Sequence, residues 1–257
     1  MYGAEQFGPA KMALSIEQAA TQAGYDVIFS HIANTHQALQ TAIQNLSGWR
    51  VDGILMIAPV AGMTYHEIRD LAPQTPIVQI DGLRDPSIPS VVSDDAAGTQ
   101  FVIDHLRELG HSHFVEFSGP QSWFSAQVRH RAMQDVEVVA SIECDWTAAS
   151  AYQATCRLPK NGYTAIVAAN DQMALGVLLA LQERGIRVPQ DVSVVGFDDI
   201  PEAPYYLPPL TTVRQEFNEM GVVGIEYLLQ LVEDPETLIQ QHRIMPKLIV
   251  RQSSSGV

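Results

Sequence analysis

Two stretches of sequence decide the fold: residues 164–171, Thr-Ala-Ile-Val-Ala-Ala-Asn-Asp, and residues 192–199, Val-Ser-Val-Val-Gly-Phe-Asp-Asp. In each, a continuous apolar run leads directly into polar side chains. Such runs are typical of parallel strands buried on both faces of a sheet, and ligands bind at the carboxyl ends of these strands. The amide and carboxylate side chains at the two strand ends predict a site for a small polyhydroxylated molecule rather than for a metal or a phosphate.

Helical and strand patterns alternate along the rest of the chain, which predicts a mostly parallel α/β architecture. Two similar series of strand–helix units, each of roughly 100 residues, indicate two lobes. We expect helices at residues 9–23, 35–46, 95–109, 121–133, 171–184 and 217–232, and strands at residues 26–30, 53–57, 76–80, 90–93, 113–117, 164–168, 192–197 and 244–250.

Composition restricts the class of protein. The chain has 257 residues, of which 46% are hydrophobic and 17% charged, and its net charge is −14. An acidic chain is poorly suited to bind nucleic acid by itself, because affinity for phosphates depends on Lys and Arg. No apolar run reaches the roughly 18 residues of a membrane span, and no secretory signal is visible at the start of the given sequence. Two isolated cysteines, Cys144 and Cys156, predict reduced thiols and a cytoplasmic protein.

A sugar site needs carboxylates or amides for vicinal hydroxyls, an Arg fork and an aromatic face. Ser125 and Arg129 are four residues apart in an expected helix, so both can reach one ligand. Asp198 and Asp199 point apart as neighbours in an extended strand, so shared acid–base work is not expected. Asn170 can bind a ligand or cap the next helix. From the residues alone, a surface position is favoured for Arg129, and a place in the core is favoured for the aromatic candidates.

The chain resembles a known family in these stretches and in several others. The further matches are residues 50–54, Arg-Val-Asp-Gly-Ile, residues 208–213, Pro-Pro-Leu-Thr-Thr-Val, and the pair Met220-Gly221. Together the matches run from about Gly8 to Arg251 in the order that the family has. The sequence therefore resembles the effector-binding core of the lactose-repressor (LacI/GalR) family of bacterial transcription regulators.

The resemblance implies the two-lobe periplasmic-binding-protein fold, in which each lobe is a mostly parallel sheet flanked by helices and the chain crosses between lobes three times. We expect an N-terminal lobe of residues 1–93 plus 216–241 and a C-terminal lobe of residues 94–215 plus 242–257. It also implies that DNA binding belongs to a helix-turn-helix headpiece, which the given sequence does not contain. Residues 131–145 and 151–162 look short against the family pattern, so we assign no element there beyond the end of the helix expected at residues 121–133.

The resemblance also implies a small-molecule effector, a sugar or possibly a galactoside, bound in the cleft between the lobes, and a homodimer. Two departures from the family's branch, Gln127 and Ile57, leave the preferred sugar open. Leu175 and Tyr206 match positions of the dimer interface. The positions that match effector contacts are Pro9, Met12, Asp81, Ser125, Arg129, Trp146, Asn170, Asp198, Gln215 and Phe217.

Two other classes of function stay open at this point. One is the periplasmic sugar-binding protein of a transporter, which shares the fold, although the motif at residues 208–213 favours the regulator. The other is an enzyme such as a carbohydrate hydrolase, for which no spacing of acid and base is seen. The eight histidines show no spacing for a metal, and no nucleotide-binding motif occurs. We therefore expect no cofactor, no metal and no enzymatic activity.

Overall fold

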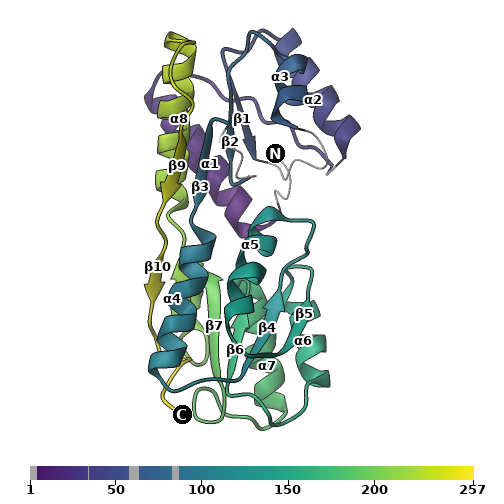
Figure 1. The fold of residues 1–257 in the computed structure, drawn as a ribbon, viewed down its shortest axis with the longest axis vertical. Helices are drawn as coiled ribbons and strands as arrows, with labels where there is room; N and C mark the ends of the chain where they lie inside the picture. Colours follow the sequence, from purple (N-terminus) through teal and green to yellow (C-terminus); the bar gives the residue numbers. More distant parts are fainter. Residues whose placement is uncertain (1–4, 34, 58–63, 83–86) are drawn as a thin grey trace. The chain divides into compact units, whose positions relative to one another are not determined.

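The computed structural model describes residues 5–33, 35–57, 64–82 and 87–257. The chain forms two compact units, each with its own sheet (Figure 1). The first unit contains residues 1–93 and 216–244, and the second contains residues 94–215 and 245–257. The expected α/β class is confirmed, with mostly parallel sheets flanked by helices. Residues 242–244, which we expected in the C-terminal lobe, belong to the first unit.

The first unit has a four-stranded parallel sheet in the order β1-β2-β3-β9. Two helices lie on each face of the sheet, as expected for strands that are apolar on both sides. The strands are β1 (Ile54–Ile57), β2 (Ile77–Ile80), β3 (Ser90–Ser93) and β9 (Gln241–Ile244), and the helices are α1 (Phe7–Gln22), α2 (His36–Gly48), α3 (Tyr65–Leu71) and α8 (Phe217–Glu233).

Alternation along the strands divides the apolar side chains of the first unit between two cores. In β1, Ile54 and Met56 pack with α2 and α3, whereas Ile57 packs with α1 and α8. In the neighbouring strand, Ile77 belongs to the α2–α3 side, and Ile80 belongs to the α1–α8 side. Burial on both faces explains why these strands read as continuous apolar runs.

The expected strand at residues 26–30 is wrong. These residues have no strand assignment, although Val27, Ile28 and Phe29 have strand-forming side chains. The physical reason is the lack of a neighbour, because a strand is held by a ladder of hydrogen bonds to another strand. In the described part of the sheet, β1 pairs with β2 only and does not reach residues 26–30.

The second unit has a six-stranded sheet in the order β10-β8-β7-β6-β4-β5, in which only β10 is antiparallel. Helices α4 and α5 lie close together, as do α6 and α7. The strands are β4 (Phe114–Ser118), β5 (Val138–Glu143), β6 (Ala165–Ala168), β7 (Ser193–Asp198), β8 (Thr211–Arg214) and β10 (Lys247–Ile249), and the helices are α4 (Asp95–Glu108), α5 (Phe124–Ala132), α6 (Ala148–Arg157) and α7 (Asp171–Glu183).

Local sequence explains where these elements begin and end. Asp94 caps α4 by accepting a hydrogen bond from Ala97 N, as expected for this residue type. The expected last strand, residues 244–250, is instead divided into β9 and β10, and Pro246 lies in the break because it lacks a backbone donor. The two stretches that we left unassigned contain β5 and most of α6. In the described residues, no helix is both long and apolar enough to cross a membrane.

Candidate functional site

The candidate site of the second unit lies at the carboxyl ends of its parallel strands. Asp198 is the last residue of β7, Asn170 follows β6 by two positions, and Gln215 follows β8 directly. Parallel strands bring their carboxyl ends to one edge of the sheet, which is where ligands bind in α/β proteins. Arg129 reaches the strand ends from α5, Ser125 lies one turn before it on the same helix, and all five side chains are buried.

Arg129 organises the charges of the site. Its Nε and Nη2 donate to Asp95 Oδ1 at 3.1 Å, and its Nη1 donates to the carbonyl oxygen of Ala169. The same Nη1 lies 3.9 Å from Asp198 Oδ1. Asp95 is the first residue of α4, so the guanidinium of Arg129 connects the start of that helix to the strand ends. A guanidinium with its donors used in this way is fixed in orientation.

The Asp198 carboxyl is held between an Arg and an amide. Gln215 Nε2 donates to Asp198 Oδ1 at 2.7 Å. Burial raises the pKa of Asp198 to about 6, and Arg129 and the Gln215 hydrogen bond only partly oppose this rise. The backbone of Asp198 is left-handed, with φ of 111°. Non-glycine residues with a strained backbone are often found at ligand-binding sites. Asp198 has both this strain and a carboxyl with a raised pKa.

The sequence left two roles open for Asn170, binding of a ligand and capping of the next helix. Its Oδ1 accepts from Met173 N at 2.8 Å and so caps α7. Its Nδ2 donates to the carbonyl oxygen of Trp146 at 3.1 Å. The cap is therefore the role that the structure shows. Binding of an effector by the same amide remains a prediction.

Trp146 forms the aromatic part of the site together with Trp123, a neighbour that was not predicted from the sequence. Trp146 is buried with a left-handed backbone, φ of 72°. The ring lies on Gly119, where an added Cβ would come within 2.2 Å of it, so only glycine fits there. The half-buried Trp123 ring meets Trp146 edge-to-face, with centroids 5.9 Å apart. No spacing rule indicated Trp123, because β5 and α5 come together only in the fold.

The carboxyls of Asp171 and Asp199 serve the structure beside the site. Asp171 accepts from Ile200 N and Thr212 Oγ1, and burial followed by the nearby Asp198 charge raises its pKa well above the ordinary value. Asp199 pairs with Arg214 at 2.7 Å and with Arg251 at 2.6 Å. The two acids thus fix the strand ends through hydrogen bonds and ion pairs within the protein.

Four predicted contact residues belong to the first unit. Met12 and Phe217 are 1% and 5% exposed in its core, where Phe217 meets Phe7 edge-to-face at 5.9 Å. Pro9 is buried in the first turn of α1. Asp81 directly follows β2 and has a left-handed backbone, φ of 53°. Asp81 therefore shares its strand-end position and its strain with Asp198, whereas Met12 and Phe217 are placed as core residues.

The two predicted interface residues differ in exposure. Leu175 is 45% exposed on α7, where Leu179 is exposed to a similar extent. Tyr206 is buried, and its hydroxyl donates to the Asp171 carbonyl oxygen at 3.2 Å. Its neighbours Tyr205 and Leu207 are the exposed side chains of this loop, at 84% and 86%.

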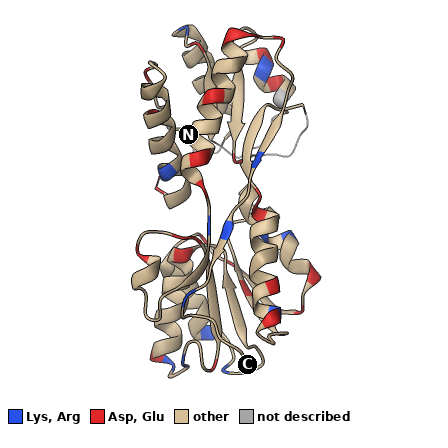
Figure 2. Ribbon diagram, turned by 90° about the vertical axis from the view of Figure 1, so that its left-hand side faces the viewer, with Lys and Arg blue, Asp and Glu red and all other residues tan. Residues whose placement is uncertain are grey.

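The arrangement suits binding rather than catalysis. Of the carboxyls near the strand ends, Asp95 is occupied by Arg129, and Asp171 is occupied by backbone and hydroxyl donors. In the described residues, no three His, Cys, Asp or Glu side chains gather as metal ligands. Acidic side chains also outnumber basic ones over both units in the view of Figure 2. The fold and the site define a small-molecule-binding protein.

Comparison with known proteins agrees with this class. The family of periplasmic binding protein-like domains matches residues 103–254. The lactose operon repressor of Escherichia coli (strain K12) is 31% identical over 256 residues, which are 96% of this chain and 71% of the repressor. A solved lac repressor dimer bound to operator and the anti-inducer ONPF has a TM-score of 0.92 at 30% identity, covering 99% of this chain and 92% of the other. A transcriptional regulator CelR–cellobiose complex has a TM-score of 0.84 at 25% identity, covering 96% and 79%.

This chain belongs to the LacI family of transcriptional regulators, and it is the effector-binding core of such a regulator. The family is cytoplasmic and not enzymatic. The transporter protein and the hydrolase that the sequence left open are therefore both set aside.

Proposed function

We propose that the second unit binds a neutral sugar as the effector, through Asp198, Asn170, Arg129, Gln215 and Trp146. The observation that carries the proposal is the buried Asp198 carboxyl at the end of β7, oriented by Gln215 and by the guanidinium of Arg129. A carboxylate accepts two vicinal hydroxyls at once, and an amide offers both a donor and an acceptor. The ring of Trp146 supplies the apolar face that the C–H groups of a sugar need.

The charges of the site favour a neutral ligand over a sugar phosphate. Arg129 is the cation that faces Asp198, and it also pairs with Asp95. Its positive charge is therefore already balanced within the protein. An anionic ligand would meet Asp198 as a like charge, which costs binding energy in a buried site.

We further propose a glycoside with an apolar or second sugar group, with galactosides as the first class to test. The pair of Trp123 and Trp146 supports this, because Trp123 extends the aromatic surface beyond what one sugar ring needs. Trp146 Nε1 is buried without a hydrogen-bond partner in the described structure, so a ligand oxygen can satisfy it. The relatives whose structures contain ONPF and cellobiose agree with a glycosidic effector.

We also propose that this core forms a homodimer and controls operator binding by a headpiece, as its relatives with operator do. The effector would act through different affinities for two arrangements of the protein, which is the requirement for any allosteric effect. The exposed Leu175 and Leu179 on α7 and the exposed Tyr205 and Leu207 support the dimer.

The test of the proposed effector is a thermal-shift and calorimetric screen with galactosides, glucosides, pentoses and their phosphates. A ligand at 100 times its dissociation constant stabilises by about 2.7 kcal/mol, which raises the melting temperature of a chain of this size by about 5–11 °C. The shift should disappear in Asp198→Asn and persist in Asp104→Asn, an exposed carboxyl on α4. A shift with phosphates alone, or an equal shift in Asp198→Asn, would contradict the proposal.

A further inference from the structure

The second unit contains an open pocket at the opposite end of its sheet from the proposed effector site. It has a volume of about 590 Å³, which is within the range of pockets that bind small ligands. His113, Thr164 and Val192 line it, and these residues directly precede β4, β6 and β7. We call it the amino-end pocket, because Asp198 and Asn170 mark the carboxyl ends of the same parallel strands.

Two cations line the amino-end pocket without a carboxylate partner among the described residues. Lys160 is exposed and makes no hydrogen bond or ion pair with any of them. Arg184 donates through Nη1 and Nη2 to the carbonyl oxygens of Thr155 and Leu158, at the end of α6. The end of a helix carries only about half a negative charge. Arg184 therefore keeps part of its positive charge for a ligand.

The acidic side chain in the described lining of this pocket, Asp191, is already neutralised by a cation of its own. Arg187 donates to its two carboxylate oxygens through Nε and Nη2, at 2.9 and 2.6 Å, and through the backbone N at 2.8 Å. These hydrogen bonds lower the pKa of Asp191 to about 2. Asp191 and Arg187 thus cancel, and Lys160 and Arg184 leave the pocket positive in a chain of net charge −14.

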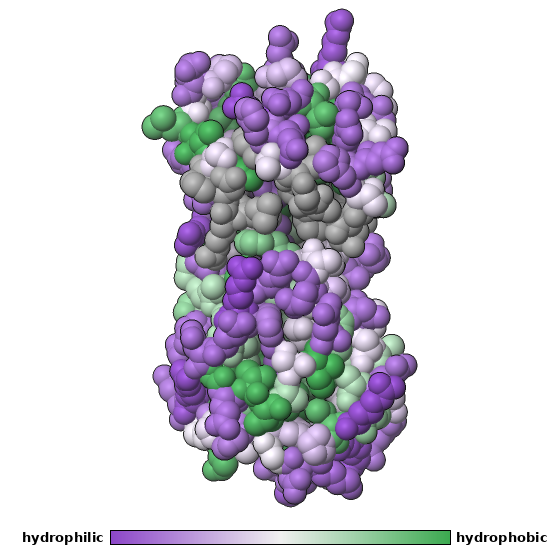
Figure 3. Space-filling model, turned by 45° about the vertical axis from the view of Figure 1, so that its right-hand side comes forward, coloured by the Kyte–Doolittle hydropathy of each residue, from purple (hydrophilic) through white to green (hydrophobic). Residues whose placement is uncertain are grey.

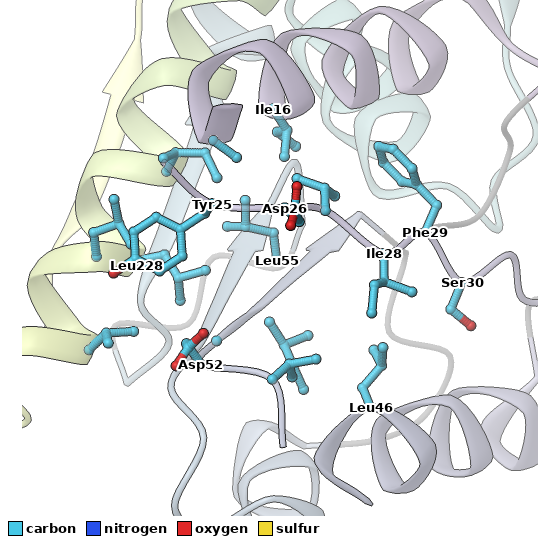
Figure 4. Close-up of a pocket in the computed structure, with 18 of the residues that line it drawn as sticks. Ile16, Tyr25, Asp26, Ile28, Phe29, Ser30, Leu46, Asp52, Leu55 and Leu228 are labelled. Carbon is cyan, nitrogen blue, oxygen red and sulfur yellow. The ribbon is translucent and has the colours of Figure 1, made fainter. Parts of the chain in front are cut away.

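A pocket of similar volume in the first unit, about 600 Å³, has the opposite charge (Figure 4). Asp26 and Asp52 are the charged side chains of its described lining, and most of the other lining residues are apolar. That pocket offers no cation to an anionic ligand. Because a strongly acidic protein repels anions in general, the positive amino-end pocket is a local exception to the charge of the chain.

A buried hydroxyl in the amino-end pocket lacks a partner. Tyr163 is 5% exposed, and its hydroxyl oxygen makes no hydrogen bond in the described structure. Burial raises the pKa of Tyr163, and the nearby charge of Arg184 only partly opposes this rise. The hydroxyl therefore keeps its proton at neutral pH and can donate it to a ligand. A buried polar group without a partner is unfavourable unless a ligand or a water satisfies it.

We propose that the amino-end pocket binds the phosphate group of a small organic phosphate. Lys160 supplies a full charge on a flexible side chain, Arg184 supplies the free N–H groups of its guanidinium, and Tyr163 supplies a hydroxyl donor. A phosphate group has three strong acceptor oxygens for these three donor groups, whereas a carboxylate has two. Ile186 and Val192 line the pocket beside the donors, and their apolar side chains suit the organic part of the ligand.

The first test is calorimetry with phenyl phosphate, inorganic phosphate and benzoate in a chloride buffer without other oxyanions. Phenyl phosphate should bind best, because it offers both a phosphate and an apolar group, and the other two should bind about tenfold more weakly. Its affinity should fall as the salt concentration rises, because Lys160 is exposed. Equal affinity for benzoate would overturn the assignment to phosphate, and no binding of either phosphate at millimolar concentration would overturn the site.

A lysine variant and a matched control locate the binding. Lys160→Gln should weaken the binding of phenyl phosphate about tenfold, because it removes the exposed charge of the pocket. Lys247→Gln removes an exposed charge from β10 of the same unit and should change the affinity little. Equal affinity in the two variants would overturn the proposal.

The unpaired hydroxyl gives a second and independent test. Tyr163→Phe keeps the ring and should weaken the binding of phenyl phosphate about tenfold, because it removes a hydrogen bond to a charged group. The same variant should keep or raise the urea midpoint of unfolding, since the hydroxyl that it removes has no partner in the described structure. Unchanged affinity, or a clear loss of stability, would show that the hydroxyl serves the fold and would overturn its assigned role.

The amino-end pocket and the proposed effector site can be told apart by variants. Binding of phosphate in the amino-end pocket should be weakened in Lys160→Gln and retained in Asp198→Asn, because Asp198 lies at the other end of the strands. The reverse pattern would place the phosphate at the carboxyl ends and overturn the proposal. In the screen for the effector, a shift with phosphates that Lys160→Gln abolishes is accordingly assigned to this pocket.

Discussion

The guanidinium group of Arg129 lies over the ring of Phe197, with its central carbon 3.7 Å from the ring centre. Phe197 is the residue before Asp198 in β7, so this contact holds the Arg next to the carboxyl that it faces. The other partners of Arg129, Asp95 and the Ala169 carbonyl, approach the edges of the same plane. Stacking together with in-plane hydrogen bonds is specific to a guanidinium and is not available to a lysine.

Replacement of Arg129 should therefore be costly even by a lysine. Arg129→Ala leaves the 3% exposed Asp95 carboxylate without its cation, and the loss of one partner of a buried pair costs about 3–5 kcal/mol. Arg129→Lys keeps the charge but loses the stacking and the fork, so we expect an intermediate loss. Urea unfolding measures both. Arg187→Ala, which breaks an exposed pair with Asp191, is the control and should change stability little. Equal stability of Arg129→Ala and the control would contradict this account.

The raised pKa of Asp198 predicts a specific pH dependence of stability. Between its ordinary pKa of 3.8 and about 6, the folded protein keeps a proton that the unfolded chain releases. The contribution of this carboxyl is thus greatest at low pH and is lost as the pH rises through this window. The size of the loss is about 3 kcal/mol. Asp198→Asn, which mimics the neutral form, should lack this loss.

The measurement for Asp198 is the free energy of unfolding from pH 4 to 7 for both proteins. The wild-type value should fall relative to that of Asp198→Asn as the pH rises. Asp171 also has a raised pKa, but it is present in both proteins, so most of its effect cancels in the difference. A difference that is constant over this pH range would show that Asp198 has an ordinary pKa in the folded protein.

Asn170 allows its cap to be separated from a role in binding. Asn170→Ala removes the bond to Met173 N and should cost about 1 kcal/mol of stability. Asn170→Ser keeps a capping oxygen but loses the amide nitrogen that donates to the Trp146 carbonyl. If Asn170 binds the effector, the Ser variant should regain most of the stability yet bind the sugar as weakly as the Ala variant. Denaturation measures the stability of the two variants, and calorimetry measures their affinity for the sugar. If Asn170→Ser also regains affinity, Asn170 acts only as the cap of α7.

How far the sequence predicts this molecule depends on how local the responsible physics is. Most of the helices and most of the apolar strands follow from short-range patterns and are found as expected, whereas the caps at Asp94 and Asn170 are assigned only by the structure. The strand at residues 26–30 fails because pairing depends on a neighbour that no local pattern supplies. Met12 and Tyr206 are buried because segments distant in the sequence pack around them. A family resemblance identifies such positions but does not tell how exposed their side chains are. Trp123 is missed for the same reason.

The contribution of Trp123 should depend on the size of the ligand. Trp123→Ala removes the ring that meets Trp146 edge-to-face, and aromatic contacts of this kind contribute about 0.5–1.5 kcal/mol. Under the proposed function, affinity for a disaccharide or an aryl glycoside should fall by this amount, and affinity for a methyl glycoside should fall less. Calorimetry with matched glycosides measures the difference, and Trp49→Ala, exposed in the first unit, is the control. Equal losses for both ligands would mean that Trp123 only supports Trp146.

Assembly of two copies should depend on the exposed apolar side chains around α7. Apolar side chains reach the surface among hydrophilic ones in Figure 3, and Leu175 and Leu179 lie one turn apart with nearly half of their surface exposed. Tyr206 is hydrogen-bonded to the first residue of the same helix, so its exposed neighbours Tyr205 and Leu207 lie near α7.

In a twofold dimer one substitution changes both sides of the interface. Leu175→Glu should therefore weaken the dimer about tenfold or more, a loss of about 1.4 kcal/mol, by burying two carboxylates. Leu238→Glu, a change of the same type at an exposed site of the first unit, should leave it intact. Sedimentation equilibrium gives the dissociation constants. Equal constants for the two variants would place the interface elsewhere, whereas a shift in Leu175→Glu alone would assign it to the exposed face of α7.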